Sequence, residues 1–153
     1  MALSDNAIVE TKPAPQRHKL EIVDGVIRIY KGAILSYEDG NIGYVELGAD
    51  AIPGQPEFAG IALEEKNLAA ADNLSDGANT VEVIPRGSGE WVKLTITSTI
   101  TIANVGDPVY VDGDDAVDLV AGITNITGGF VGIIREYLTA NSAWVQLTQH
   151  PIL

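Results

Sequence analysis

The sequence predicts an all-β fold: a compact β-barrel or β-sandwich of short antiparallel strands, with little helix and an extended N-terminal arm. Two observations predict it. Short runs alternate between two faces, as in VIRIY (26–30) and TVEVI (80–84). Turn dipeptides such as Asp24-Gly25 separate such runs, and Asp-Gly between alternating runs is a strong hairpin signal. Many short strands joined by frequent turns are typical of sandwiches and barrels.

Residues 1–18 form the first predicted element, the arm. The stretch TKPAPQRHK (11–19), which ends one residue past it, contains two prolines and almost no apolar side chain. Such a composition builds neither a helix nor a central strand. The first twenty residues carry a net charge of +1, whereas the whole chain has a net charge of −12. We expect the arm either to be mobile or to become ordered on a partner. Residues 19–153 are then expected to form a single β domain.

A repeated phrase organises this β domain. FAGIALEE (58–65) and FVGIIREY (130–137) share the frame Phe-x-Gly-Ile. Each follows a strand, an Asp-Gly turn and a second strand, so segments 32–65 and 106–137 read as a pseudo-repeat. Alanine, leucine and glutamate in the first phrase favour a helix, but the shared frame predicts a strand in both places. Glycine beside phenylalanine is expected to allow a β-bulge or a close crossing.

The only helix candidate is NLAAADN (67–73), which is short enough to be a single turn or an irregular loop. The side chains available for catalysis are few, since the 153 residues include two histidines and no cysteine. Glu64 and Glu65 are adjacent, so on a strand they point to opposite faces and cannot flank one bond. The acidic turn DGDDAVD (112–118) lacks the ligand order of a calcium loop. We therefore expect no catalytic residue, no cofactor and no metal site.

The acidic composition also bears on partners. A strongly negative surface repels phosphate backbones and anionic lipids. No apolar run approaches the roughly 20 residues that a membrane-spanning helix needs. We therefore expect neither nucleic acid nor a membrane as a partner.

The order of these segments resembles the small head-decoration, or cement, proteins of tailed bacteriophages. The resemblance is carried by FAGIA (58–62), Asp72-Asn73, VEVIPRG (81–87), GDPVYV (106–111) and the closing strands from Gly132 to Val145. It covers approximately residues 25–148 and consists of several short, individually unspecific matches rather than one diagnostic motif. The arm and TSTITIAN (97–104) are not part of it.

The resemblance implies a structural virion protein without catalytic activity. Such a protein is made in the host cytoplasm and binds the outer surface of the expanded capsid, as homotrimers at three-fold positions. There it bridges neighbouring major capsid proteins. Small β domains often use edge strands to pair with partners, and many weak contacts add up through multivalency.

Two sets of site residues follow as expectations. The arm is expected to contact the capsid through Lys12, Pro13, Pro15, Arg17 and His18. The trimer core or interface is expected to use Trp91, Trp144 and Tyr110. One alternative is a carbohydrate-binding or adhesion module of a virion or cell surface, which needs a cluster of exposed aromatic side chains. Another is an enzyme, which needs a pocket holding a carboxylate of raised pKa; nothing in the sequence points to one.

Overall fold

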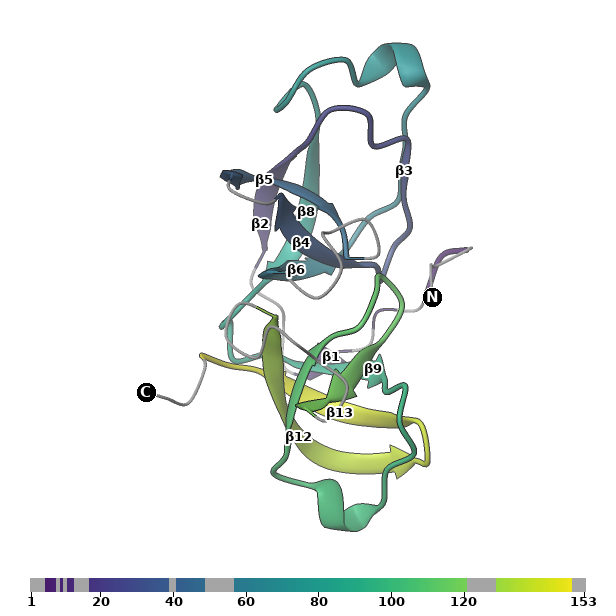
Figure 1. Cartoon of the computed structure of the whole chain (residues 1–153), viewed down its shortest axis with the longest axis vertical. Helices are drawn as coiled ribbons and strands as arrows, with labels where there is room; N and C mark the ends of the chain where they lie inside the picture. The colour runs from purple at the N-terminus through teal and green to yellow at the C-terminus, as the bar shows by residue number, and fades with distance from the viewer. Residues whose placement is uncertain are drawn as a thin grey trace.

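The computed structural model describes residues 5–7, 9, 11–12, 17–38, 41–48, 57–120 and 129–149. In this part of the chain the fold is all-β, as the sequence predicts, with only two short 3-10 helices (Figure 1). The strands form two main sheets, stacked along the long axis of the molecule (Figure 1).

The first sheet is a closed barrel. Its strand order is β2 (His18–Ile22), β5 (Asn41–Leu47), β4 (Ile34–Glu38), β6 (Glu57–Ala62) and β8 (Thr80–Pro85). A small pair, β3 (Arg28–Ile29) with β7 (Lys66–Asn67), is separate from the barrel, and β3 lies at its side in Figure 1. The 3-10 turn η1 (Ala70–Asp72) lies beyond the barrel at the top of Figure 1. The helix candidate at 67–73 therefore contains only the single 3-10 turn η1, and its first residue, Asn67, belongs to strand β7.

The second sheet has six strands. Their order is β1 (Thr11–Lys12), β9 (Trp91–Thr95), β13 (Ser142–Leu147), β12 (Phe130–Thr139), β10 (Pro108–Val111) and β11 (Val117–Leu119). Ile96, just after β9, makes a parallel bridge to Val117 in β11. This bridge curls the sheet into a second, less fully paired barrel. A second 3-10 turn, η2 (Ile102–Asn104), lies at the opposite end of the molecule from η1 (Figure 1).

The two barrels share one topology. In each, the second strand in chain order (β4 or β10) lies between the third and the fourth (β5 and β6, or β11 and β12). In each, the first strand is antiparallel to the last, β2 to β8 and β9 to β13. The parallel bridge Ile22–Val45 in the first barrel corresponds to Ile96–Val117 in the second. The predicted pseudo-repeat thus falls on matching strands of two tandem barrels.

The two Phe-x-Gly phrases have the same local structure. Gly60 pairs with Leu35 while Phe58 pairs with Ser36, so one residue of β6 is bulged out between them. In β12, the same shift occurs between Phe130 and Gly132. Both glycines also lie against the backbone of the next strand: a Cβ on Gly60 would lie 2.6 Å from the carbonyl oxygen of Ile84. The predictions of strands, and of a bulge or close crossing, are confirmed.

Two apolar clusters form the core. One fills the first barrel and includes Ile22, Leu35 and Val83. The other fills the second barrel and extends into the first through Ile34, Phe58, Ile61 and Ile84. Since successive strand side chains point to opposite faces, β4, β6 and β8 supply side chains to both clusters. The barrels therefore pack against each other through a continuous apolar junction.

Candidate functional site

A segment near the N-terminus connects the two barrels. We call Asp5–Ala7, Val9 and β1 the strap. Strand β1 pairs with the edge of β9 in the second barrel, Thr11 opposite Val92 and Lys12 opposite Trp91. The amide of Ala7 donates to the carbonyl oxygen of Lys31 in the first barrel at 2.7 Å. The strap is thus hydrogen-bonded to both barrels.

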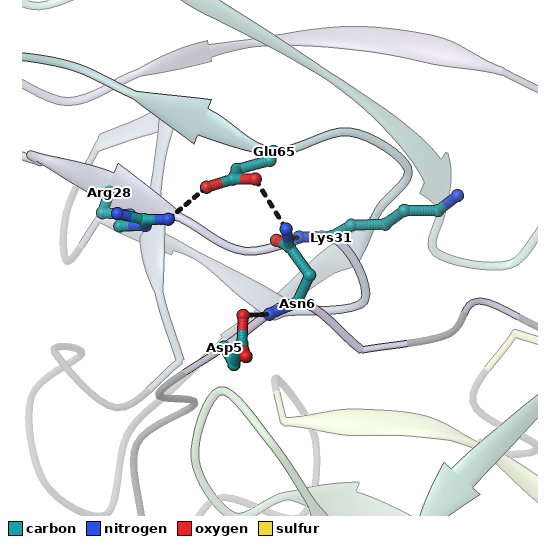
Figure 2. Close-up of polar contacts among 5 residues, drawn as sticks. All are labelled: Asp5, Asn6, Arg28, Lys31 and Glu65. Atoms are coloured by element: carbon teal, nitrogen blue, oxygen red, sulfur yellow. Dashed lines mark hydrogen bonds and ion pairs between the residues drawn. The ribbon is translucent and has the colours of Figure 1, made fainter.

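Asn6 is the polar anchor of the strap (Figure 2). Its Oδ1 accepts from the amide of Lys31 at 3.0 Å, and its Nδ2 donates to Oε2 of Glu65 at 2.6 Å. The other oxygen of Glu65 accepts from Arg28. Figure 2 shows the side chain of Lys31 directed away from this carboxylate, so Lys31 takes part through its backbone. Asn6 and Glu65 are 59 residues apart, and no local pattern in the sequence signalled their contact.

A cavity of about 260 Å³ lies between the strap, the first barrel and β9. Its apolar lining includes Ala7 and Val9 from the strap, and its polar lining includes Asp115 and Ser142. Oδ1 of Asp115 is buried and accepts no hydrogen bond. Among the described lining residues Asp115 is the only carboxylate and there is no histidine, so this lining lacks the paired groups of acid–base hydrolysis.

The two tryptophans lie on the outward face of the second barrel. Trp144 pairs with Lys93, and Trp91 pairs with Gln146, so the two indoles occupy diagonal positions on neighbouring strands. Both are half-buried, while their neighbours Val92 and Val145 are fully buried on the inward face. Successive side chains of a strand point to opposite faces, and the structure places the tryptophans on the face that does not point into the barrel core.

Tyr110 lies elsewhere, in the core of its own chain. It is buried, and its ring packs edge-on against Phe130 with 5.9 Å between the ring centroids. Burial raises the pKa of the Tyr110 phenol above its ordinary value because it disfavours the phenolate. Tyr110 therefore does not share a surface with Trp91 and Trp144.

The predicted capsid-contact residues are placed apart from one another. Lys12 belongs to β1 on the second barrel, whereas His18 begins β2 of the first barrel. Arg17 pairs with Glu82 of β8, with 2.8 Å between Nη1 and Oε1. Pro13 and Pro15 lie outside the described residues. Where the arm was expected to reach residue 18, the structure has strand β2 beginning at His18.

Exposed apolar side chains mark the two ends of the long axis. Ile27 and Leu74, at the η1 end, are 54% and 75% exposed. Ile102 at the η2 end is also 75% exposed. No motif in the sequence marks these residues; the only signal is a leucine inside the polar turn NLSDG (73–77).

Within the described ranges, no three carboxylates or histidines are grouped so as to bind a metal ion. No helix in the same ranges has the length and hydropathy needed to cross a membrane. Neither the family models nor the curated proteins include a match to this sequence.

Proposed function

We propose that this chain is a structural virion protein that binds the outer surface of an expanded phage capsid. It assembles as trimers at three-fold positions and bridges neighbouring major capsid proteins. The proposal combines the sequence resemblance with the aromatic face of the second barrel, which is the observation that carries it. Half-buried tryptophans side by side on a sheet face are the kind of anchor found in protein interfaces.

The architecture supports this role in a second way. The apolar junction and the strap join two barrels into one body. A rigid body transmits load between two attachment points, which is what a bridging protein must do. The acidic surface also keeps closely spaced copies soluble.

The test is co-sedimentation of the purified protein with expanded heads of the matching phage, with unexpanded proheads as the control. Saturable binding to expanded heads alone is the expected result, and the bound amount gives the copy number per head. Binding to neither form, or equally to both, contradicts the proposal.

Deletion of residues 1–12 tests the part played by the strap. The deletion stops before Arg17 and His18, because His18 belongs to β2. We expect a folded protein that binds expanded heads about tenfold or more weakly, since several weak contacts are lost at once on every copy. Unchanged binding by the truncated protein would remove the strap from the capsid contact.

A second candidate function is a carbohydrate-binding module, favoured by the same two tryptophans. Their outward face also carries Gln146, whose Oε1 accepts from Arg135 at 2.9 Å, and aromatic rings beside polar side chains suit sugar binding. Glycan titrations monitored by tryptophan fluorescence distinguish the two candidates. Saturable quenching that Trp144→Ala abolishes supports the module, and no response to a glycan panel argues against it.

A further inference from the structure

The end of the first barrel farthest from the strap has an unusual combination of charge and apolar exposure. We call loops 23–27 and 68–79 the first tip; it lies at the top of Figure 1. Three exposed aspartates occupy it, Asp24, Asp72 and Asp76. Neither loop contains a lysine, arginine or histidine. The same two loops carry Ile27 and Leu74, large apolar side chains that are exposed.

The first tip is held by hydrogen bonds centred on a buried asparagine. Asn73 is only 2% exposed, and its Nδ2 donates at 2.9 Å to the carbonyl oxygens of both Val23 and Val26. The carbonyl oxygen of Asn73 in turn accepts from the amide of Gly25 at 3.0 Å. These hydrogen bonds hold the two loops side by side. Ile27 directly follows Val26 and Leu74 directly follows Asn73, so both side chains are attached to hydrogen-bonded backbone.

Three further bonds fix the Asp76 carboxylate and the rest of the longer loop. Oδ1 of Asp76 accepts from the amide of Asp24 at 2.9 Å. The side chain of Asn79 donates to the carbonyl oxygen of Asp72 at 2.9 Å and to Oδ1 of Asn73 at 3.2 Å. The first bond joins the two loops and the other two lie within loop 68–79, so the positions of Ile27 and Leu74 are set before any partner arrives.

A surface of this kind has the properties of a binding site. Apolar side chains held out in water are unfavourable by roughly 25 cal/mol per Å² of exposed apolar area, which burial against a partner recovers. Preorganised loops lose little conformational entropy on binding. Carboxylates on loops that contain no basic residue attract a positively charged partner and repel phosphates and anionic lipids. The chemistry therefore fits a protein surface on which lysine or arginine surrounds an apolar pocket.

We propose that the first tip is the docking surface of this protein, with Leu74 and Ile27 as apolar anchors and the three aspartates facing basic side chains of the partner. The identity of the partner rests on the proposed function: we infer that it is a basic, partly apolar region of the outer surface of the expanded capsid. The inference places the contact at the end of the molecule, in addition to any contact made by the strap.

The other end of the molecule provides a matched control. Ile102 is as exposed as Leu74. It too stands on a preorganised turn: the amide of Thr101 donates to Oδ1 of Asn104 at 2.8 Å, and Thr101 Oγ1 accepts from Ala103. This turn has one adjacent carboxylate, Asp107, which accepts from Nδ2 of Asn104 at 2.9 Å, whereas the first tip has three aspartates. Replacing Ile102 removes an equally exposed apolar side chain without touching the first tip.

The experiment is co-sedimentation with expanded heads for the wild type, Ile27→Ser/Leu74→Ser, Asp72→Asn/Asp76→Asn and Ile102→Ser. The asparagine at position 76 keeps the oxygen that accepts from Asp24. We expect the apolar double variant to bind about tenfold or more weakly. We expect the charge variant to bind weakly at low salt and to approach the wild type as salt rises, because salt screens exposed charges. Ile102→Ser should bind as the wild type does. Unfolding midpoints of all variants confirm that each is folded.

The outcomes separate this inference from the proposed function. Wild-type binding by the apolar double variant, or an equal loss in Ile102→Ser, overturns the docking role of the tip and leaves capsid binding intact. Failure of the wild type itself to sediment with heads overturns the proposed function and the capsid contact of the tip together.

Discussion

The two barrels have one topology but close differently. In the first barrel β2 and β5 share two parallel pairs, Glu21 with Tyr44 and Ile22 with Val45. The corresponding contact in the second barrel is the single bridge between Ile96 and Val117. The remaining edge of β9 is covered in part by β1. Ala7 of the strap bonds to Lys31 of the first barrel instead of to β9. The cavity lies beside this part of the strap and is lined by Ala7 and by residues of β9.

This difference shows how the same strand plan can serve two purposes. Full closure removes unpaired edges, which are otherwise available to other chains. The first barrel closes with its own strands and has the acidic tip at its far end. The second barrel leaves an edge that a separate segment of the chain occupies. The backbone pattern is otherwise preserved: the amide of Gly32 donates to Ala62, and that of Gly106 donates to Ile134, both at 2.8 Å.

The largest expected effect comes from the equivalent glycines. A Cβ on Gly132 would collide with the carbonyl oxygen of Gln146, whereas a Cβ on Gly60 would lie 2.6 Å from that of Ile84. We expect Gly132→Ala to lower the free energy of unfolding by about 3 kcal/mol or more, and Gly60→Ala by about 2 kcal/mol. Urea denaturation measures both. Equal or negligible losses of unfolding free energy in the two variants would contradict the close strand crossing. Gly89→Ala is the control: Gly89 has a φ of +84° and a Cβ there would meet no atom within 4 Å, so this variant measures the cost of backbone strain alone.

The second effect compares two asparagines. Asn73 is buried and bonds two carbonyl oxygens of the first tip, whereas Asn141 is exposed and donates to the carbonyl oxygen of Ile96 at 3.2 Å. Asn73→Ala leaves buried acceptors unsatisfied and should cost about 2 kcal/mol of unfolding free energy. Asn141→Ala should cost less than about 1 kcal/mol, since Asn141 is exposed and its bonds to carbonyl oxygens are long, from 3.2 to 3.4 Å. A reversed order, measured by thermal or urea unfolding, would contradict the role of Asn73 as the centre of the tip.

The third effect is a gain in stability. Ser36 and Tyr110 occupy matching positions, each paired with the phenylalanine of a Phe-x-Gly phrase. Ser36 is fully buried and its Oγ has no hydrogen-bond partner. Ser36→Ala should therefore raise the unfolding free energy by about 1 kcal/mol, because an unsatisfied buried hydroxyl is removed. Ser88→Ala is the control: its Oγ accepts from Glu90 at 3.2 Å, so that variant should lose stability instead.

The smallest effect appears only in alkali. The pKa of Tyr110 is raised by burial from the value of about 10 that it has in the unfolded chain. Above that pH the unfolded state loses the phenolic proton while the folded state still holds it, so stability falls as pH rises. Tyr110→Phe should flatten this part of the decline above pH 10 and leave the pH dependence below it unchanged. A profile identical to that of the wild type would contradict the burial of the phenol.

The sequence predicted the strands of the fold better than the surfaces. FAGIALEE forms a strand despite its helix propensity, as the shared Phe-x-Gly frame predicted. The β-bulge and the close strand approach both require a glycine two residues after the phenylalanine. The strap was missed because its anchor, Asn6 with Glu65, joins distant positions. The pattern of Trp91 and Trp144 predicted one buried face per strand, but only the paired strands decide which face points inward. Tyr110 alternates with Val109 and Val111, yet all three are buried. The Tyr110 ring packs edge-on against Phe130, a contact between strands that alternation along β10 alone could not predict.

Both ends of the described chain lie near the junction between the two barrels. The strap lies against Lys31 and β9, and the carbonyl oxygen of Leu147 accepts from the amide of Gly89 in the link between the barrels. The two tips, in contrast, lie at the ends of the long axis (Figure 1). A reporter or antigen fused genetically near either terminus would therefore emerge from the side of the molecule, and both tips would stay uncovered.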